Sequence, residues 1–567
     1  MNKLKTKSSI LISTLTLFFA FTLTFSFSSS HATEVKSKHG MVVAAHPAAS
    51  EFGLEILKSG GNAVDAAVGT ALIIGVVEPN ASGLGGGGGM LIYLHDLDSL
   101  TYINYYARAP RLIATNFNSY LESKTAPAVL VPGTVAGLHH ALQKYGTISW
   151  EDLLTKVIRK AKKGFKVEDT FYKILLDSYE SLLKYSQTKS IYLVDDFPPE
   201  VGQTIINNKL ITTLEKLAHG GTDIFYRGEI ADSIEATMIR LGGGLRKSDL
   251  KTYRPLELQP IRGTYRGHTV FSAPPPQSGI TIVEILNILE LKNLSAMGDF
   301  SNNASSFHFM AEAMKRGYAD RMKYQSDPEF FNVPNNILLS KEFARSRFKT
   351  INMQQAVPVN PEETPAGNIS SFLNPNDAEP KNKDGSTTHI SVVDAKGNAV
   401  SLTQTLNHFW GSGISVCGFI MNNGMTAFSR SNPANNIQSN RQPRSTISPS
   451  MLFENKDLRM VIGSPGGGRI ISTIVEVICN VIDFDKSAVQ ANNAARFCSR
   501  KSLTNLPVES RFSPEMLEQL KLMGHNIKVF GEMDLYFGGV QLIVIDPKKK
   551  LLIGSSDPRR SGVALGY

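Results

Sequence analysis

Two strand-like segments, residues 389–393 and 399–407, are joined by a short turn and are expected to form a β-hairpin. If the loop has three residues, the register places Thr387 opposite Thr405. Asn407 shares a face with Thr405, because alternate residues of a strand point to the same side. The pattern therefore predicts a hydroxyl at the head of one strand, facing a hydroxyl and an amide on the next.

A threonine at the head of a strand matters chemically only if a base lies beside it. Its hydroxyl is a weak nucleophile until a base is within hydrogen-bond reach. If the chain is cut between Ser386 and Thr387, the freed α-amine is such a base, with a pKa of about 8. A hydroxyl at Thr405 would then hold the nucleophile's orientation. The alternative is an ordinary solvent-facing edge hairpin, because threonine is also a good strand former.

The composition changes sharply in front of this threonine. Residues 357–386 are rich in Pro, Asn, Asp and Glu and lack apolar periodicity, which is typical of a disordered linker. The segment ends at the proposed scissile bond. A flexible tail at this place favours a self-cleaving precursor, since the new chain end must move clear of the active site.

A glycine run, residues 466–468, follows a predicted strand (460–463) and precedes a predicted helix (469–482). Adjacent backbone N–H groups at such a junction can point at one oxyanion, the electrostatic device that acyl transfer needs. Gly466 and Gly467 are therefore candidates for an oxyanion hole. A simple turn is the alternative interpretation.

The sequence around the hairpin resembles the autocleavage site of the gamma-glutamyltranspeptidases, a family of N-terminal nucleophile hydrolases. The resemblance covers nearly the whole chain after residue 33. It is carried by 387–394 (TTHISVVD), 397–407 (GNAVSLTQTLN), 60–67 (GGNAVDAA), 82–89 (SGLGGGGG), 132–137 (PGTVAG), 273–276 (APPP), 318–321 (YADR), 463–467 (GSPGG) and 556–559 (SDPR).

The resemblance implies an α/β fold, a four-layer αββα sandwich with two stacked antiparallel sheets. It implies a precursor that cleaves itself into a large subunit, residues 33–386, and a small subunit, residues 387–567, which stay together as a heterodimer. Thr387 is then the nucleophile and its α-amine the base. Thr405 matches the threonine that positions the nucleophile, and Gly466 and Gly467 match the oxyanion hole.

The resemblance also assigns contacts to the substrate. Asn407 matches a residue at the α-carboxylate end of the γ-glutamyl group, and Ser445 and Thr446 match a serine pair with the same task. The implied substrate is a small γ-glutamyl amide of the glutathione type. The acceptor is an amino acid, a peptide or water, and no cofactor or metal is expected.

The residues with which the family binds the α-carboxylate and α-amino groups of the substrate are not retained. Tyr106 stands where glutathione-using members have a carboxylate-binding arginine, and the run 422–428 (NNGMTAF) has Ala427 in place of an aspartate, as well as lacking a glutamine. Buried, paired contacts of this kind are worth about 2–5 kcal/mol each. Arg108 and Arg444 are candidates to compensate. The loop 429–445 is short, so we also expect an open cleft.

Residues 1–32 resemble a secretory signal, with three lysines, an apolar run and small residues before a cleavage point after Ala32. The alternative is an uncleaved membrane anchor. No second apolar span follows, so we expect a periplasmic or secreted protein without a stable membrane span. The formal net charge of the 567-residue chain is +9, but its basic residues are dispersed, so nucleic acid is not an expected partner.

Two further expectations concern individual side chains. Cys417, Cys479 and Cys498 are odd in number and lack metal-ligand spacing, so either one disulfide or free thiols would fit. A predicted helix over residues 307–322 carries Glu312, Lys315, Arg316 and Asp320 at helical spacing. We interpret these four as surface ion pairs. Residues 139–260 are predicted to be mainly helical.

The leading hypothesis is an exported gamma-glutamyltranspeptidase-like enzyme that works through an acyl-enzyme on Thr387. A second hypothesis keeps the mechanism but changes the acyl group, to poly-γ-glutamate or a glutaryl-type amide. A third is a catalytically inactive binding protein on the same scaffold. The retained threonines and glycines argue against the third, because an abandoned site has no physical reason to keep them together.

Overall fold

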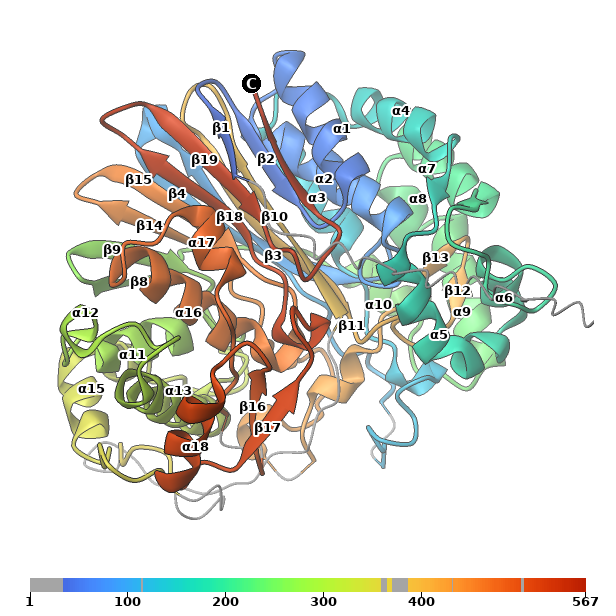
Figure 1. The fold of residues 1–567 in the computed structure, drawn as a ribbon. Helices are drawn as coiled ribbons and strands as arrows, with labels where there is room; N and C mark the ends of the chain where they lie inside the picture. Colours follow the sequence, from blue (N-terminus) through green and yellow to red (C-terminus); the bar gives the residue numbers. More distant parts are fainter. Residues whose placement is uncertain (1–33, 114–115, 358–364, 370–385, 431, 501–503) are drawn as a thin grey trace, which may run out of the picture. The chain divides into compact units, whose positions relative to one another are not determined.

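The computed structural model describes residues 34–113, 116–357, 365–369, 386–430, 432–500 and 504–567 (Figure 1). The expected signal segment, residues 1–32, lies outside the described residues, as does most of the expected linker, residues 357–386. Within the described residues, no helix combines the length and the apolar character needed to cross a bilayer.

Two seven-stranded sheets are formed by the described residues, and all neighbouring strands pair antiparallel. The first sheet has the order β20 (Val563–Gly566), β2 (Met41–Ala44), β10 (Ser386–Val393), β11 (Ala399–Asn407), β3 (Gly87–Leu94), β4 (Ser99–Tyr105) and β7 (Leu256–Leu258). The second has the order β1 (Glu34–Ser37), β19 (Leu551–Ser556), β18 (Gln541–Asp546), β15 (Asp457–Gly463), β14 (Ser450–Glu454), β9 (His268–Ser272) and β8 (Ile261–Tyr265).

Helices cover the outer face of each sheet (Figure 1). Buried side chains of α1 (Pro47–Lys58), α2 (Ala63–Val77) and α3 (Thr134–Tyr145) pack against the first sheet. Those of α11 (Gly279–Leu289) and α16 (Ile470–Ile482) pack against the second, and α13 (Ala304–Tyr324) packs on α11. A third apolar cluster, with Val43, Leu91, Met451 and Val461, lies between the sheets. The expected αββα sandwich is confirmed.

The remaining elements surround these layers. Residues 139–260 are mainly helical as predicted, with α4 (Trp150–Ala161), α5 (Asp169–Leu183), α6 (Ser186–Tyr192), α7 (Asn208–Gly220), α8 (Asp223–Tyr226), α9 (Glu229–Arg240) and α10 (Lys247–Thr252). The other helices are α12 (Leu294–Met297), α14 (Asn335–Leu338), α15 (Lys341–Phe348), α17 (Ala488–Asn493) and α18 (Pro514–Leu522). Short paired strands are β5 (Phe165–Lys166), β6 (Thr204–Ile205), β12 (Ser415–Val416), β13 (Phe419–Ile420), β16 (Leu506–Glu509) and β17 (Ile527–Phe530).

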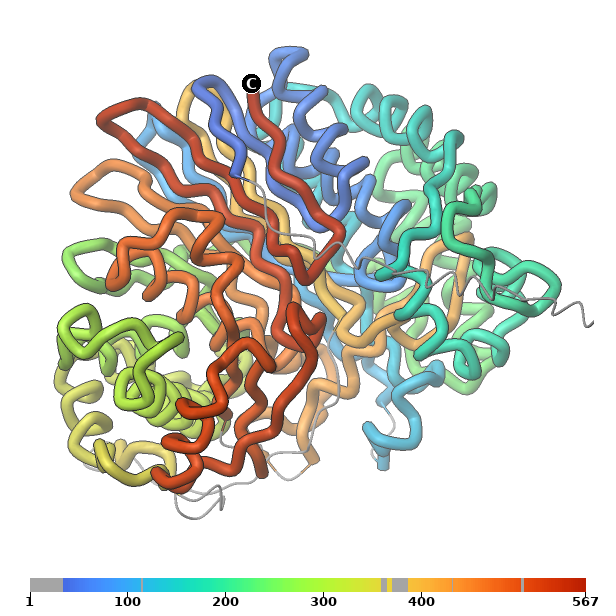
Figure 2. The backbone as a smooth tube through the Cα atoms, in the orientation of Figure 1, coloured from blue at the N-terminus to red at the C-terminus, as the bar shows by residue number. Residues whose placement is uncertain are grey.

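Segments from both ends of the chain alternate within each sheet. In the first sheet, β10 pairs with β2 on one side and β11 pairs with β3 on the other. Figure 2 shows these yellow strands running beside the blue N-terminal ones. The pieces before and after residue 386 are therefore joined by continuous backbone ladders.

The hairpin of β10 and β11 is central and buried, so the alternative of a solvent-facing edge hairpin is wrong. Its apolar side chains pack under α2, as the alternation predicted. Its polar face meets the second sheet instead of water: Ser401 Oγ donates to the carbonyl of Ile462 at 3.0 Å, and Ser391 Oγ to that of Gln541 at 2.9 Å. Period-two patterning identifies the two faces of a strand but does not reveal what covers the polar one.

The interpretation of the α13 charges as surface ion pairs is also wrong, although the pairs exist. Lys315 Nζ lies 2.6 Å and Arg316 Nη1 2.7 Å from the carboxylate of Glu312, and all three side chains are buried. The segment 350–357 covers them, since Lys315 also donates to the carbonyl of Val357. Helical spacing predicted the partners, and a loop distant in sequence made them interior.

Candidate active site

The start of β10 carries a β-bulge at the proposed nucleophile. Ser386 pairs with Asn407 and Thr388 with Gln404, with a register shift between the two pairs. From Thr388 onward the register is the one predicted for a three-residue hairpin loop. Thr387 itself has no partner in this ladder, and bulges of this kind redirect a side chain at functional sites.

One hydroxyl connects the proposed nucleophile with the proposed scissile carbonyl. Thr405 Oγ1 lies 3.2 Å from Thr387 Oγ1, and it donates to the carbonyl oxygen of Ser386. It also accepts from the backbone N–H of Asn407 at 2.8 Å. A hydroxyl has one proton, so while Thr405 donates to Ser386 it accepts from Thr387. Both threonines are buried.

The residues on either side of Thr387 are anchored by the segment that follows α2. Ser386 Oγ donates to the carbonyl of Asn80 at 2.9 Å, and Thr388 Oγ1 donates to Glu78 Oε2 at 3.3 Å. Burial raises the pKa of Glu78 to about 7, against the opposing charge of Arg560. Sequence analysis missed this anchor, because a polar residue after an apolar helix gives no signal of its own.

The glycine run leads into α16 as predicted. Gly466 (φ 129°) and Gly467 (φ 53°) both adopt the backbone region that favours glycine. Thr446 Oγ1 donates to the carbonyl of Gly467 at 2.8 Å, and Tyr318 Oη to that of Gly468 at 2.6 Å. Among the described residues, no group accepts from the amide N–H of Gly466 or Gly467. The run therefore presents two fixed amide donors.

Asn407 belongs to a polar network beyond the nucleophile. Its Nδ2 donates to Thr426 Oγ1 at 2.6 Å and to the carbonyl of Asn423 at 3.3 Å. Asn423 in turn donates to the carbonyl of Ser123 at 3.0 Å and accepts from the N–H of His408 at 3.0 Å. Asn423 and Ser123 were not among the predicted site residues.

Tyr106 fills the place of the family's arginine with a buried ring, and its hydroxyl is hydrogen-bonded to Ser445. Its carbonyl accepts from Tyr253 Oη at 3.0 Å and from Gln442 Nε2 at 2.9 Å. Ser445 Oγ also accepts from the N–H of Ile447 at 3.3 Å. The Tyr106 and Ser445 side chains are neutral and bonded to each other, and the positive charge of Arg321 lies close enough to oppose the rise that burial causes in the pKa of Tyr106.

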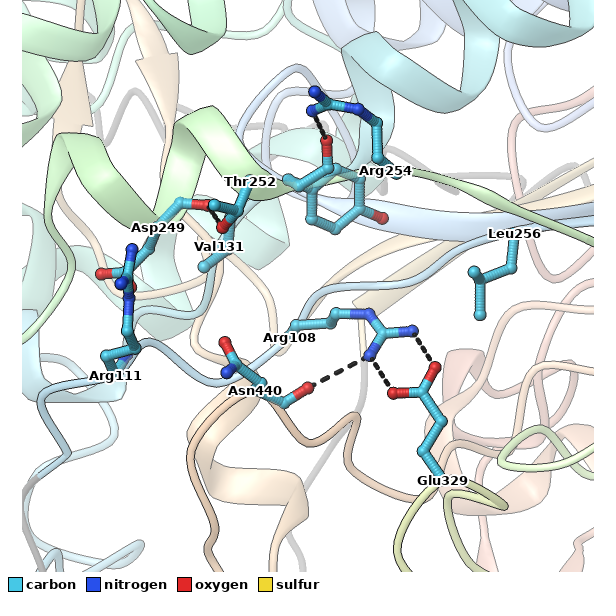
Figure 3. A pocket seen from close by; sticks show the side chains of 10 residues that line it. Arg108, Arg111, Val131, Asp249, Thr252, Arg254, Leu256, Glu329 and Asn440 are labelled. Carbon is cyan, nitrogen blue, oxygen red and sulfur yellow. Dashed lines mark hydrogen bonds and ion pairs between the residues drawn. The ribbon is translucent and has the colours of Figure 1, made fainter.

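The two arginines expected to compensate have partners inside the protein. Arg108 binds the carboxylate of Glu329 through two nitrogens, at 2.9 and 3.1 Å, on the wall of a cavity of about 390 Å³ (Figure 3). Arg444 Nη1 donates to the carbonyls of Arg321 at 3.0 Å and Met322 at 2.7 Å. Within the described residues, neither contacts Thr387.

One other cluster has metal-ligating side chains. His308, Glu312 and His525 are buried with ligand atoms within 4.8 Å of one another. Lys315 and Arg316 already neutralise Glu312, and His308 Nδ1 lies 2.9 Å from His525 Nε2. A divalent cation would face two fixed positive charges here, so this donor set fits an internal hydrogen-bonded cluster better. The cysteine thiols, Cys417, Cys479 and Cys498, are free.

Comparisons with known proteins agree with this geometry. The chain is 36% identical over 550 residues to the glutathione hydrolase proenzyme of Escherichia coli (strain K12), covering 93% of this chain and 91% of that protein. It is 33% identical over 522 residues to the capsule biosynthesis protein CapD proenzyme of Bacillus anthracis, covering 92% and 89%. A cephalosporin acylase structure from Bacillus halodurans has a TM-score of 0.85 at 29% identity, covering 95% and 97%.

Two stacked antiparallel sheets between helical layers, with a threonine at the head of a central strand, define an enzyme of the N-terminal nucleophile hydrolase class. Residues 49–567 match the gamma-glutamyltranspeptidase family, so the chain belongs to that family.

Proposed function

We propose that the chain cleaves itself between Ser386 and Thr387 and then acts as an acyltransferase or hydrolase through Thr387. In the first reaction, Thr387 Oγ adds to the carbonyl carbon of Ser386. The C–N bond breaks, the amine takes up a proton, and an ester remains. Water hydrolyses the ester to the Ser386 carboxylate and the free Thr387 hydroxyl, with the α-amine now beside it as a base.

The observation that carries the proposal is the position of the Thr405 hydroxyl. It donates to the carbonyl oxygen on which negative charge develops during cleavage, and it lies 3.2 Å from the attacking oxygen. A fixed donor at a developing oxyanion is commonly the largest single contribution to acyl transfer. Gly466 and Gly467 would supply the corresponding donors for external substrates.

The proposed products are a large subunit, residues 33–386, and a small subunit, residues 387–567. The alternation of β2, β10, β11 and β3 supports a stable heterodimer, because separating the pieces would break the ladders on both sides of the hairpin. Export to the periplasm or beyond the cell, with removal of residues 1–32, completes the proposal.

The proposed substrate is a γ-glutamyl or related amide, with water, an amino acid or a peptide as acceptor. The sequence similarity to a glutathione hydrolase proenzyme supports a glutathione-type donor. The neutral side chain at Ala427, where a free ammonium group would lack an acidic partner, favours a second candidate, an acyl group that carries a carboxylate but no free amine. Likeness to a cephalosporin acylase and to CapD is compatible with this alternative.

Self-cleavage is tested by denaturing electrophoresis of the purified protein and by N-terminal sequencing. We expect two chains, the smaller beginning at Thr387, and turnover of γ-glutamyl or glutaryl anilide. The Thr387→Ala variant should remain one chain without activity. If that variant is still processed, Thr388 or a separate protease is responsible. A cleaved wild type that turns over no amide would instead support the inactive binding protein.

A further inference from the structure

We propose that the ammonium group of Lys124 binds a carboxylate of the acyl donor, in place of the arginine that Tyr106 replaces. The inference rests on the proposed function, because it names the donor class for the same site. The ligand class is an amide whose acyl chain ends in a carboxylate, such as a glutaryl or γ-glutamyl group.

Lys124 reaches the chain that leaves the catalytic hairpin. Its Nζ donates to the carbonyl of Phe409 and, at 2.9 Å, to the carbonyl of Gly411. These carbonyls follow Asn407, the last residue of β11, by two and four positions. An ammonium group has three donors, and these two contacts leave one for a ligand.

Lys124 has no acidic partner among the described residues, whereas several buried cations elsewhere in the protein do. Lys315 is paired with Glu312, and Arg559 with Glu509 and Asp557. Lys124 is held by neutral carbonyls alone, and burial lowers the pKa of its ammonium to about 7. Removing a charge from water is unfavourable unless an opposite charge compensates it, so an anionic ligand is the missing partner.

The polar network around Asn407 connects Lys124 to the proposed substrate site. Asn423 contacts Asn407, His408 and the carbonyl of Ser123, the residue directly before Lys124. Burial, together with the nearby charges of Lys124 and Arg469, lowers the pKa of His408 to about 3, so the imidazole adds no charge. This side of the site therefore combines the charges of Lys124 and Arg469 with neutral amides and hydroxyls.

This environment suits a carboxylate and disfavours a second ammonium. A carboxylate at Lys124 would gain a charge-assisted hydrogen bond. An ammonium group facing Asn423 and Thr426 would find only neutral acceptors, which compensate its charge in part. The absence of an acidic residue from the run 422–428 removes the partner that a free α-amine would need. The donor with a terminal carboxylate and no amine is the better match.

The test compares glutaryl anilide with its uncharged analogue, pentanoyl anilide, on the processed enzyme. Lys124→Met should raise KM for glutaryl anilide about 10- to 100-fold and leave KM for pentanoyl anilide unchanged. Lys124→Arg should retain most of the preference. Lys144→Met is the matched control, because Lys144 is an exposed lysine paired with Glu257 on the surface.

A second measurement uses the wild type, so that a folding defect in the variant cannot hide the result. An amine with a lowered pKa reacts readily with an acylating reagent, and mass spectrometry follows the modification of Lys124. Glutarate should protect Lys124, and glutaramide should not. Equal KM ratios in Lys124→Met and wild type, or equal protection by the two probes, would overturn the inference. A wild type that is never processed would refute the proposed function instead.

Discussion

The Thr405→Val substitution isolates the chemistry of one hydroxyl. Valine has nearly the same shape as threonine, so the buried packing of β11 stays the same. The change removes the donor to the Ser386 carbonyl, the acceptor of the Asn407 N–H and the contact with Thr387. These losses affect both the folding stability and the rate of self-cleavage, and the two effects differ in size.

The expected loss of stability is small and the expected loss of rate is large. A neutral hydrogen bond contributes about 1 kcal/mol to folding, so the free energy of unfolding should fall by about 1–2 kcal/mol. In the cleavage transition state the carbonyl oxygen becomes an oxyanion, and removing one donor to it costs about 2.7–4 kcal/mol. We therefore expect self-cleavage to slow by about 10²- to 10³-fold.

The assay is a pulse of labelled cell-free synthesis followed by denaturing electrophoresis, which resolves the precursor from its two products over time. Thr403→Val is the matched control. Thr403 lies two residues earlier on the same buried face, and its Oγ1 is 2.8 Å from His389 Nδ1 but does not contact the scissile peptide. Both variants lose a buried hydroxyl, and only Thr405→Val should slow cleavage. Cleavage of Thr405→Val at the wild-type rate would refute the role of Thr405.

Three other variants test separate parts of the site. Thr446→Val releases the carbonyl of Gly467, so kcat should fall about tenfold or more with little change in KM. Tyr106→Arg combined with Ala427→Asp restores a cation and an anion for an amino-acid end, so kcat/KM for γ-glutamyl anilide should rise. Glu78→Gln removes a carboxyl group whose pKa is raised to about 7 by burial. The free energy of unfolding of the wild type should therefore fall by up to about 3 kcal/mol as the pH rises from 4.5 through 7, because the folded state holds this proton more tightly than the unfolded state. The variant should lose this pH dependence.

Each of these has a measurement that decides it. Unchanged kcat in Thr446→Val would show that Gly467 needs no support from that hydroxyl. A double variant no better than wild type on γ-glutamyl anilide would show that the losses at 106 and 427 do not limit the amino-acid substrate. Urea midpoints at pH 5 and pH 8 report on Glu78, and an identical pH dependence in the variant would contradict its raised pKa.

The sequence predicted the elements whose signals are local. The start of α2 (Ala63–Val77) shows such a local signal, because Asn62 and Asp65, three residues apart, form a reciprocal capping box there. The register of the hairpin could be predicted from the loop length, but the residue at which β10 begins could not. β10 begins at Ser386 because Ser386 pairs with Asn407 across a bulge, which no local pattern encodes.

The parts that sequence analysis missed depend on contacts between distant segments. Glu78, Asn423 and Lys124 lie near the catalytic hairpin only because the sheet order brings their loops there, and each looks like an ordinary polar residue in its own window. The resemblance to a family identified Tyr106 as a departure, but only the structure shows that the Tyr106 hydroxyl is hydrogen-bonded to Ser445. Local periodicity predicts helices and strands, whereas the partners of charged side chains can be identified only from the tertiary structure.

The geometry of the uncleaved chain explains how one site would serve two reactions. Cleavage after Ser386 removes one pair from the β10–β11 ladder and leaves the pairing from Thr388 to Val393 intact, so the strand keeps its place between β2 and β11. Once the Ser386 carbonyl leaves, the single proton of the Thr405 hydroxyl has lost its acceptor. That proton can then be donated to Thr387 Oγ, 3.2 Å away, with the new α-amine as the base. The same hydroxyl would polarise the carbonyl during maturation and orient the nucleophile during turnover.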